Sequence, residues 1–424
     1  MSKNISSFSQ SQDISGKIDK NFPAAIDFLL NRDILNTMKK TIITLNEVKR
    51  QNLRSVLSLL LHSDGLSRIE IAGKLGCDNT TVSRAVRELI ERGIIDTGSK
   101  NNTAAGRPRI ALRMNPAGPL LIGIAWEPDG ITGMLTDLKS EPLRVENIRF
   151  RHSPDREEYL TAAAEIIQKL EQAADKPVSG VGVTVFGSYF GPDFTLEKVA
   201  SLPVLNGLQL RPFLSGCTTC GELMICDHSV AVSNYLVRRY PEFNSGSAML
   251  ITSGKGLGVV LLENGRRLFS RNNHGGEFGH AIHQPGGPLC ACGRRGCLET
   301  LVSTSALLKQ YRKESSPKAT FEQFAKDFCE QKKAAGQIVF PAIKILANAV
   351  AEQLNNFPAD KLILSGEILK FGNRMESCFR ESVKDALFTL AKNDLNFYFP
   401  ASDAKDLLAT GASMLAAENF CRQL

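Results

Sequence analysis

The chain has 424 residues, too many for one ordinary hydrophobic core, so we expect two or three domains. Hydrophobic residues make up 43% and charged residues 22%, as in a soluble globular protein. No run of about 18 apolar residues is present, which argues against a membrane-spanning helix, and the N-terminal segment MSKNISSFSQSQD lacks the apolar core of a signal peptide. We therefore expect a cytoplasmic protein with no membrane partner.

The net charge of +7 is unevenly distributed along the chain. Residues 47–113 contain twelve Lys and Arg against seven Asp and Glu, which leaves a net charge of only +2 for all other residues. A basic excess in one short segment indicates a module that faces nucleic acid.

Residues 1–45 form an N-terminal extension. Its first twenty residues are rich in Ser, Asn, Gln and Lys, so we expect the extension to be partly disordered. Residues 24–38 have the pattern of an amphipathic helix, but no motif gives this helix a function.

Residues 46–115 have the pattern of a winged helix-turn-helix. The periodicity predicts a first helix from Val48 onward. Ser67 and Glu70 form a capping box that opens a second helix, which Gly76 ends. Asp78 is the expected N-cap of a third helix. The buried face of the third helix carries Val82, Val86, Leu89 and Ile90. Two short helices joined by a tight glycine-containing turn are a helix-turn-helix.

The exposed face of the third helix has short hydrogen-bonding side chains at its start and arginines further along. This composition suits base edges and phosphates, although an ordinary amphipathic helix with a polar face has the same pattern. The candidate DNA contacts on the helices are Ser67, Arg68, Asn79, Thr80, Thr81, Ser83, Arg84 and Arg87.

The segment that follows favours DNA binding. Ile94 and Ile95 begin one predicted strand, the alternating apolar residues at 110, 112 and 114 form another, and a polar loop lies between them. The loop ends in AGRPR, which adds Arg107 and Arg109 to the candidate contacts. Gly-Arg-Pro is similar to a short motif that some proteins lay into an AT-rich minor groove. We therefore predict a winged helix that binds a double-stranded DNA operator.

Strands and helices alternate after Asn115-Pro116, which makes the fold class α/β. Strand-like apolar runs occupy 120–125, 181–186, 223–226, 248–251 and 361–364. Helical patterns occupy 157–173, 298–313, 341–354, 374–391 and 411–420. Asn264-Gly265, between two apolar runs, predicts a type I′ hairpin turn.

The stretch GGEFGHAIHQPGGPLCACGRRGCLET, residues 275–300, contains a candidate metal site. Cys290, Cys292 and Cys297 lie within eight positions, among glycines and a proline that let them converge with little backbone strain. One imidazole would complete a closed, tetrahedral Cys₃His zinc site, with His274, His280 and His283 all within reach. The alternative is a disulfide with a spare thiol. A C-x-C pair is too close for an unstrained bridge, and nothing indicates an oxidising compartment.

Two carboxylates, Glu277 and Glu299, flank these cysteines. Carboxylates fixed beside a metal-stapled loop are good acceptors for sugar hydroxyls, although spacing alone slightly favours a pair of solvated charges.

GEFGH followed by CACGRRGCLE resembles the zinc and sugar signature of the ROK family, which comprises sugar kinases and sugar-responsive repressors. The resemblance covers the chain from about Asn46 to the C-terminus. It implies that His280 is the fourth ligand of a structural Zn²⁺, and that Glu277, His280 and Glu299 face a sugar. It also implies that Asp227 occupies the position of the sugar-activating base, in a pair where Cys226 replaces the usual Asn.

The same resemblance implies the architecture. SRIEIAGKLG, TTVSRAVRELIERGII and GRPRIALRMNP are similar to the DNA-binding domain of ROK repressors, which free-standing ROK kinases lack. A two-lobed, actin-like sugar-kinase fold is then expected after it, with lobe 1 at 116–235 and lobe 2 at 236–424. The last helix is expected to return to lobe 1. We expect a homodimer or homotetramer.

The expected phosphate site departs from that of the kinases. Their first strand runs into an Asp and a Gly-Gly-Thr hairpin, whereas here it runs into Ala125 and then Trp-Glu-Pro-Asp-Gly. Glu127 and Asp129 would repel a polyphosphate, and Pro128 removes an amide donor. A second glycine-rich segment, SGKGLG at 253–258, persists but is a weak signal. The Cys217-x-x-Cys220 pair is most simply explained as small packing residues.

We therefore predict a repressor of carbohydrate genes that responds to a sugar or sugar derivative and does not phosphorylate it, with Asp227 only a vestigial base. Two alternatives stay open. The chain would be a sugar kinase with an added DNA-binding module, or a regulator that a protein partner controls and whose sugar site is vestigial.

Overall fold

The computed structural model describes residues 45–63, 65–101, 109–268, 273–388, 394–400 and 406–424. The chain divides into two compact units, Met1–Asn52 and Leu53–Leu424. The predicted helix over 24–38 lies outside the described residues.

The helix-turn-helix and its strands form as predicted. Three helices, α2 (Leu45–His62), α3 (Arg68–Leu75) and α4 (Asn79–Glu91), are followed by the antiparallel strands β1 (Ile95–Asn101) and β2 (Arg109–Met114). Ser67 and Glu70 make the reciprocal hydrogen bonds of a capping box at the start of α3. Gly76 ends α3 in the left-handed conformation, with φ 62°, and the Asp78 side chain caps α4.

The rest of the chain contains two five-stranded sheets with the same topology. The first has the order β5 (Pro142–Arg149), β4 (Gly130–Thr136), β3 (Leu120–Glu127), β6 (Val178–Val185), β9 (Leu223–Asp227). The second has the order β12 (Arg266–Leu268), β11 (Leu257–Glu263), β10 (Ser247–Ser253), β13 (Lys361–Ser365), β14 (Asn396–Tyr398). In each sheet, the strand that comes first in the chain (β3 or β10) pairs antiparallel with the next strand (β4 or β11). The same strand pairs parallel with a later one (β6 or β13). This repeated unit is the two-lobed arrangement of the actin-like sugar kinases.

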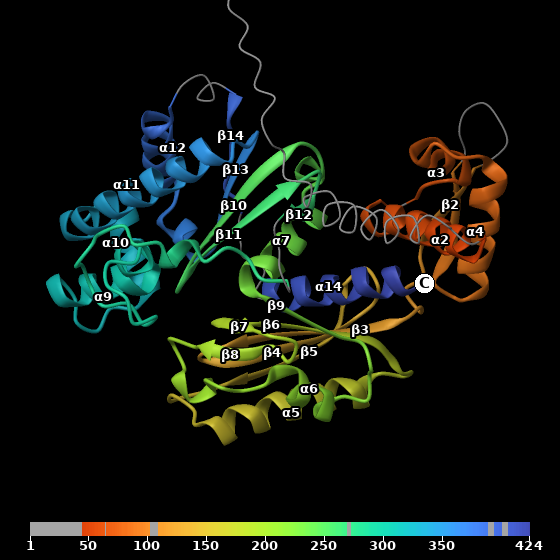
Figure 1. Ribbon diagram of the computed structural model, residues 1–424, viewed down its shortest axis with the longest axis horizontal. Coiled ribbons are helices and arrows are strands. Elements are labelled where there is room, and N and C mark those ends of the chain that lie inside the picture. Colours follow the sequence, from red (N-terminus) through yellow and green to blue (C-terminus); the bar gives the residue numbers. More distant parts are fainter. Residues whose placement is uncertain (1–44, 64, 102–108, 269–272, 389–393, 401–405) are drawn as a thin grey trace, which may run out of the picture. The chain divides into compact units, whose positions relative to one another are not determined.

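Helices cover both faces of each sheet (Figure 1). α5 (Arg156–Ala173) and α6 (Leu210–Cys217) lie on one face of the first sheet, where Ile166 and Ile167 of α5 pack with Ile122 and Ile124 of β3. On the second sheet, α11 (Lys333–Asn356) and α12 (Asn373–Ala386) contribute to the largest apolar cluster, together with α9 (Thr304–Glu314) and α10 (Phe321–Cys329). α7 (His228–Arg239) packs on its opposite face.

The last helix, α14 (Leu407–Gln423), packs on the first sheet so closely that its backbone almost touches the backbone of the strands. A Cβ atom at Gly123 of β3 would lie 2.1 Å from the carbonyl oxygen of Ala409, and one at Gly182 of β6 would lie 1.9 Å from that of Ala412. Glycine is therefore required at both strand positions. Further along α14, Ala416, Ala417 and Cys421 belong to the same buried apolar cluster as the winged-helix residues Leu53, Val56, Leu57, Leu60, Val86 and Leu89.

Two predicted helices differ from the structure. The helix expected over 298–313 is interrupted at Ser303, which has extended backbone, so it forms α8 (Glu299–Val302) and α9. The helix expected to begin at Pro341 begins at Lys333, with Pro341 inside α11. Buried Ile338 and Ile343 on either side of the proline explain why the helix continues, since their burial offsets the backbone hydrogen bond that proline removes.

In the described part of the chain, α11 is the one helix long and apolar enough to cross a membrane by length and composition. Its residues Ile338, Val339, Ile343, Leu346 and Val350 are buried in the second lobe, as in the core helix of a globular domain. The Asn264-Gly265 turn has positive φ at both residues, 49° and 73°, as a type I′ hairpin requires.

Candidate metal centre and ligand cleft

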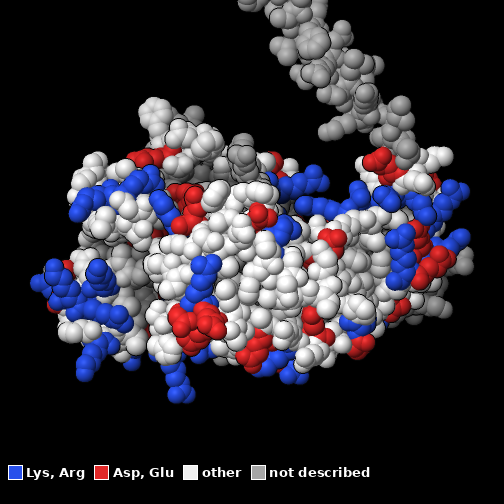
Figure 2. Space-filling view, turned by 60° about the horizontal axis from the view of Figure 1, so that its bottom comes forward, with Lys and Arg blue, Asp and Glu red and all other residues white. Residues whose placement is uncertain are grey.

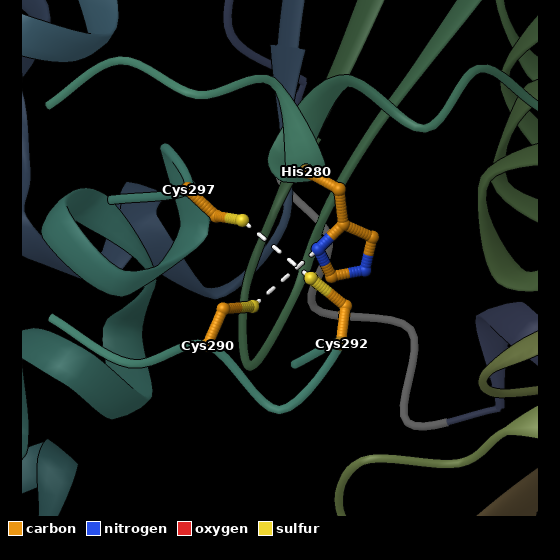
Figure 3. Close-up of side chains that lie close together, drawn as sticks. All are labelled: His280, Cys290, Cys292 and Cys297. Carbon is orange, nitrogen blue, oxygen red and sulfur yellow. Dashed lines mark hydrogen bonds between the residues drawn. The ribbon is translucent and has the colours of Figure 1, made fainter. Parts of the chain in front are cut away.

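Four side chains converge between β11 and α8. His280, Cys290, Cys292 and Cys297 have ligand atoms that all lie within 4.8 Å of one another (Figure 3). The Nδ1 atom of His280 is 3.6 Å from the Cys290 Sγ atom, and the Sγ atoms of Cys292 and Cys297 are also 3.6 Å apart. The structure therefore selects His280 from the three histidines in reach.

The separations of these atoms fit a metal ion better than a disulfide. Ligands of a tetrahedral zinc ion, with bonds of about 2.3 Å to sulfur and about 2.1 Å to nitrogen, lie about 3.6 to 3.7 Å apart. A disulfide requires about 2.05 Å between the sulfur atoms, and all three cysteines are free thiols. The donor set is therefore one that could hold a metal ion.

The backbone of the loop brings the three thiols together. The Cys290 amide donates to the Arg294 carbonyl at 2.7 Å, closing a turn around Cys292. Gly296 has φ 76°, and a Cβ atom there would lie 1.6 Å from the Gln284 carbonyl oxygen. The loop therefore depends on this glycine for the path of the chain into Cys297.

The charge distribution favours a thiolate at Cys292. Burial opposes ionisation, but the main-chain and side-chain donors of Arg294 lower the pKa of Cys292 to about 6. Burial and the neighbouring thiols raise the pKa of Cys297 to about 12. One thiolate therefore suppresses the next, a repulsion that a bound cation would relieve.

Glu277 joins the metal centre to the cleft. Its carboxylate lies 3.8 Å from Nε2 of His280, the ring nitrogen that faces away from the thiols, and accepts a hydrogen bond of 2.6 Å from Ser188 on β7 (Ser188–Phe190). A carboxylate behind a metal-binding imidazole fixes its orientation. Glu277 is half exposed, so it also faces the cavity.

Asp227 ends β9 and caps α7. Its Oδ1 atom accepts from the Val230 amide at 2.8 Å, and its Oδ2 atom accepts from the Gly275 amide and lies 3.3 Å from the His274 ring. Both oxygens are therefore already engaged, and the carboxylate is fixed at the cavity wall.

His274 is a site residue that the sequence analysis considered only as a metal ligand. Its ring lies between Asp227 Oδ2, at 3.3 Å, and Glu277 Oε1, at 3.4 Å, and packs edge-on against Tyr189. It thus joins two of the predicted sugar residues. Only the tertiary contact between β9 and the 273–277 segment brings it there, so no local sequence pattern could have identified it.

Glu299 is a partly buried carboxylate of the cleft. It accepts a hydrogen bond of 3.3 Å from the Leu257 amide at the start of β11, and burial raises its pKa. The predicted sugar residues Asp227, Glu277, His280 and Glu299 all line one cavity of about 860 Å³.

The other half of this cavity is lined by the turns of two hairpins. Ala125, Glu127, Pro128 and Asp129 come from the β3–β4 hairpin, and Gly254, Lys255 and Gly256 from the β10–β11 hairpin. Lys255 forms an ion pair of 3.2 Å with Asp129, and Arg149 lies 3.4 Å from Glu127. Although burial opposes it, Lys255 lowers the pKa of Asp129.

Trp126 and Cys226 do not face the cavity. Trp126 is fully buried among Tyr159 and Phe213, because alternate strand residues point to opposite faces. Cys226 is fully buried with Val230 and Leu415. A direct effect of the Asn-to-Cys change on a sugar hydroxyl therefore has no support in this geometry.

The cysteines at 217 and 220 are half-buried free thiols that pack against the core of the first lobe, as expected for packing residues. Burial raises the pKa of each thiol.

On the helix-turn-helix, the exposed candidates are Asn79, Thr80, Arg84 and Arg87, while Arg68, Thr81 and Ser83 are half-buried. Ser67 is 5% exposed and its hydroxyl is bonded to Glu70 at 2.7 Å, so its side chain is not presented to DNA, contrary to the prediction. The Thr81 hydroxyl is bonded to the Asp78 carboxylate at 2.6 Å. Arg107 and the side chain of Arg109 lie outside the described residues. Figure 2 shows Lys and Arg side chains over this region at the right of the view, with acidic side chains among them.

The model of the ROK family matches residues 121–419, and that of a winged helix-turn-helix DNA-binding domain matches residues 49–96. The chain therefore belongs to the ROK family and carries a DNA-binding domain before its ROK domain.

Transcriptional regulators are among its relatives. The DNA-binding transcriptional dual regulator NagC of Escherichia coli is 25% identical over 368 residues, which cover 81% of this chain and 87% of NagC. The xylose repressor of Bacillus spizizenii is 22% identical over 385 residues, 88% of this chain and 96% of that protein. The crystal structure of a ROK family transcriptional regulator, a homologue of the E. coli MLC protein, superposes with a TM-score of 0.72 at 20% identity, covering 89% of this chain and 98% of that one.

A kinase of the family is similar as well. The glucokinase of Thermotoga maritima is 25% identical over 249 residues, which cover 54% of this chain and 76% of the kinase. The presence of a ROK domain therefore does not by itself separate a regulator from an enzyme, and the chemistry of the cleft has to do so.

Proposed function

We propose that the protein is a cytoplasmic repressor of carbohydrate metabolism genes, a homodimer or homotetramer. Its winged helix, at 46–115, binds a DNA operator, and a sugar or sugar derivative binds in the cleft between lobes 116–235 and 236–424. The observation that carries this proposal is the contrast within one cavity. The carboxylates and imidazoles of a sugar site are held in place, while the turn expected to cradle phosphate carries Glu127 and Asp129.

Two buried hydroxyls support a cleft that still binds a ligand. Ser253 and Ser365, at the ends of β10 and β13, line the cavity and are each 1% exposed. Among the described residues, neither Oγ atom has a hydrogen-bond partner. An unsatisfied buried hydroxyl costs about 1 to 3 kcal/mol, which a ligand or water in the cleft would offset. Both hydroxyls are therefore consistent with an occupied cleft.

The kinase alternative has weaker support. Phosphoryl transfer depends on positioned donors and cations around the transferred phosphate. Ala125 stands where the resemblance places an Asp, and Pro128 offers no amide. The side chain of Asp129 extends to Lys255, so the lysine of the glycine-rich turn is already paired. Asp227 is positioned as a base would be, but both of its oxygens accept hydrogen bonds from the protein.

We assign the metal centre a structural role, with zinc as the ion. His280, Cys290, Cys292 and Cys297 supply four protein ligands, and a tetrahedral site then has no position left for water. The ion would hold the loop that carries Glu277 and Glu299 and so keep the sugar side of the cleft in shape.

The first experiment measures operator binding. Full-length protein selects an operator from random duplexes, and the affinity of Arg84→Ala and Arg87→Ala is then measured against salt concentration. If these exposed arginines meet phosphates, each change weakens binding and lowers the salt slope by about 1. Lys309→Ala, an exposed lysine on α9, is the control and should bind as wild type. Unchanged affinity in both arginine variants would refute the assignment of α4.

The second experiment tests the effector. A panel of sugars is scored by thermal shift, and each sugar that binds is tested for its effect on operator affinity. A sugar couples to DNA only if it binds the two states of the protein differently, which the shift in operator Kd measures. A protein that binds its operator but responds to no sugar would support control by a protein partner instead.

A further inference from the structure

The cleft is acidic overall. Its lining includes seven carboxylate residues, Glu127, Asp129, Asp227, Glu277, Glu299, Glu367 and Asp406. In the described part of the lining there are four Lys and Arg residues, Arg149, Lys198, Lys255 and Lys370. A ligand that carries negative charge therefore enters a cavity where like charges outnumber opposite ones.

Three of the four cations are already neutralised by acidic partners. Lys255 pairs with Asp129 at 3.2 Å and Arg149 with Glu127 at 3.4 Å. Lys370 lies 3.1 Å from Glu322 and 3.9 Å from Glu367. A phosphate would have to break one of these pairs, and the carboxylate left behind would then lie beside it.

Lys198 is the exception. It is at the end of β8 (Thr195–Lys198), and its Nζ atom donates to the Cys292 carbonyl at 3.1 Å, so its partner is uncharged. Among the described residues of the lining, it is the one cation whose charge remains to attract an anion without displacing a carboxylate.

The acceptors in the sugar half favour hydroxyl donors. Asp227 and Glu299 are fixed by backbone amides, and Glu277 by Ser188 and the two histidines. Carboxylates accept hydrogen bonds from neutral hydroxyls at no electrostatic cost, whereas a phosphate offers them no donor at neutral pH.

We infer that the effector is an unphosphorylated sugar and that the cleft rejects sugar phosphates. This inference rests on the proposed function, which requires a sugar in this cavity. It goes beyond that function by assigning the charge class of the ligand.

The test uses matched pairs: glucose with glucose 6-phosphate, and N-acetylglucosamine with N-acetylglucosamine 6-phosphate. Binding to the full-length protein is measured by titration calorimetry at equal ionic strength. In any pair that binds, we expect the parent sugar to bind at least 10-fold more tightly than its phosphate. Tighter binding of a phosphate would overturn the inference but leave the proposed function intact. If neither pair binds, and no other sugar in the panel does, the sugar site itself is refuted.

Two variants sharpen the result. Glu127→Gln combined with Asp129→Asn removes two negative charges and frees Arg149 and Lys255, so the preference for the parent sugar should shrink. No change in preference would contradict an electrostatic origin. Lys198→Gln removes a cation, so the preference for the parent sugar should be kept or should grow. A wild-type protein that prefers the sugar phosphate and loses that preference in Lys198→Gln would show that Lys198 holds a phosphate, and would overturn the inference.

Discussion

The β3–β4 and β10–β11 hairpins occupy equivalent places in the two sheets, yet their turns have opposite chemistry. The turn between β10 and β11 is Gly254-Lys255-Gly256, with small residues and a cation, while that between β3 and β4 is Pro128-Asp129 flanked by Glu127. Both line the same cavity and are joined by the Asp129–Lys255 ion pair. The repeated topology thus determines where the two turns meet, but their side chains determine what the cleft can bind.

The loop that carries Cys290, Cys292 and Cys297 gives the largest expected effect, because we propose that it holds the sugar half of the cleft in shape. Cys292→Ser removes a ligand, so the protein should lose its metal and the loop that carries Glu277 and Glu299 should loosen. Binding of zinc to structural sites contributes on the order of 10 kcal/mol, so a large loss of thermal stability is expected. Metal content by mass spectrometry checks this. Cys220→Ser, a thiol outside the cluster, should keep its metal, and full retention of zinc in Cys292→Ser would refute the site.

The second-largest expected effect is a loss of sugar affinity when a carboxylate of the cleft is neutralised. Asp227→Asn keeps an N-cap for α7, since Asn caps helices well, but loses the negative charge that a sugar hydroxyl would meet. Loss of a hydrogen bond to a charged group costs about 1.5 to 3 kcal/mol, so sugar affinity should fall about 10- to 150-fold. Glu299→Gln should act in the same direction. Titration with the bound sugar measures both, and Lys309→Ala should bind as wild type.

The Asp129–Lys255 ion pair between the two hairpins should contribute little to the free energy of unfolding. Its two side chains are more than half exposed, so Asp129→Asn should cost at most about 1 kcal/mol of unfolding free energy at pH 7. Because the folded pKa of Asp129 is lowered, this contribution is present above its unfolded pKa of about 3.9 and is lost as the pH falls below it. Denaturant melts of both proteins at pH 7 and pH 3 should therefore converge at the lower pH. If the difference in unfolding free energy between the two proteins grew on acidification, it would contradict a pKa of Asp129 that is lowered by folding.

The last prediction is the absence of sugar kinase activity. If the β3–β4 turn no longer cradles phosphate, ATP should give no sugar-dependent turnover above background. An ordinary kinase of this class turns over on the order of 1 per second or faster, so the assay has ample range. Phosphorylation of a hexose at that rate would show that the two hairpins still act together.

The candidate metal site was predictable because three of its four side chains lie close together in the chain. Spacing left three histidines open, and the resemblance to the ROK family implied His280, which is the histidine that lies beside the three thiols in the structure. The burial of Trp126 beside cavity-lining Ala125 and Glu127 follows from strand alternation, which the sequence does encode. His274 and the partners of Glu127 and Asp129 depend on contacts between distant segments, which local patterns do not encode. Ser67 satisfied a capping motif, and that role explains why its hydroxyl is not available for DNA.

The close packing of α14 has a consequence for exchange of backbone hydrogens. Leu407, Leu408 and Ala409 at its start line the cleft, and Cys421 near its end is buried with the winged helix. At Gly123 and Gly182 the helix backbone lies directly against β3 and β6, so the three elements share one tightly packed interface. The amides of α14, β3 and β6 should therefore exchange as one cooperative unit, the slowest in the first lobe. A ligand that slows exchange in this unit would slow it at both the cleft and the base of the DNA-binding domain.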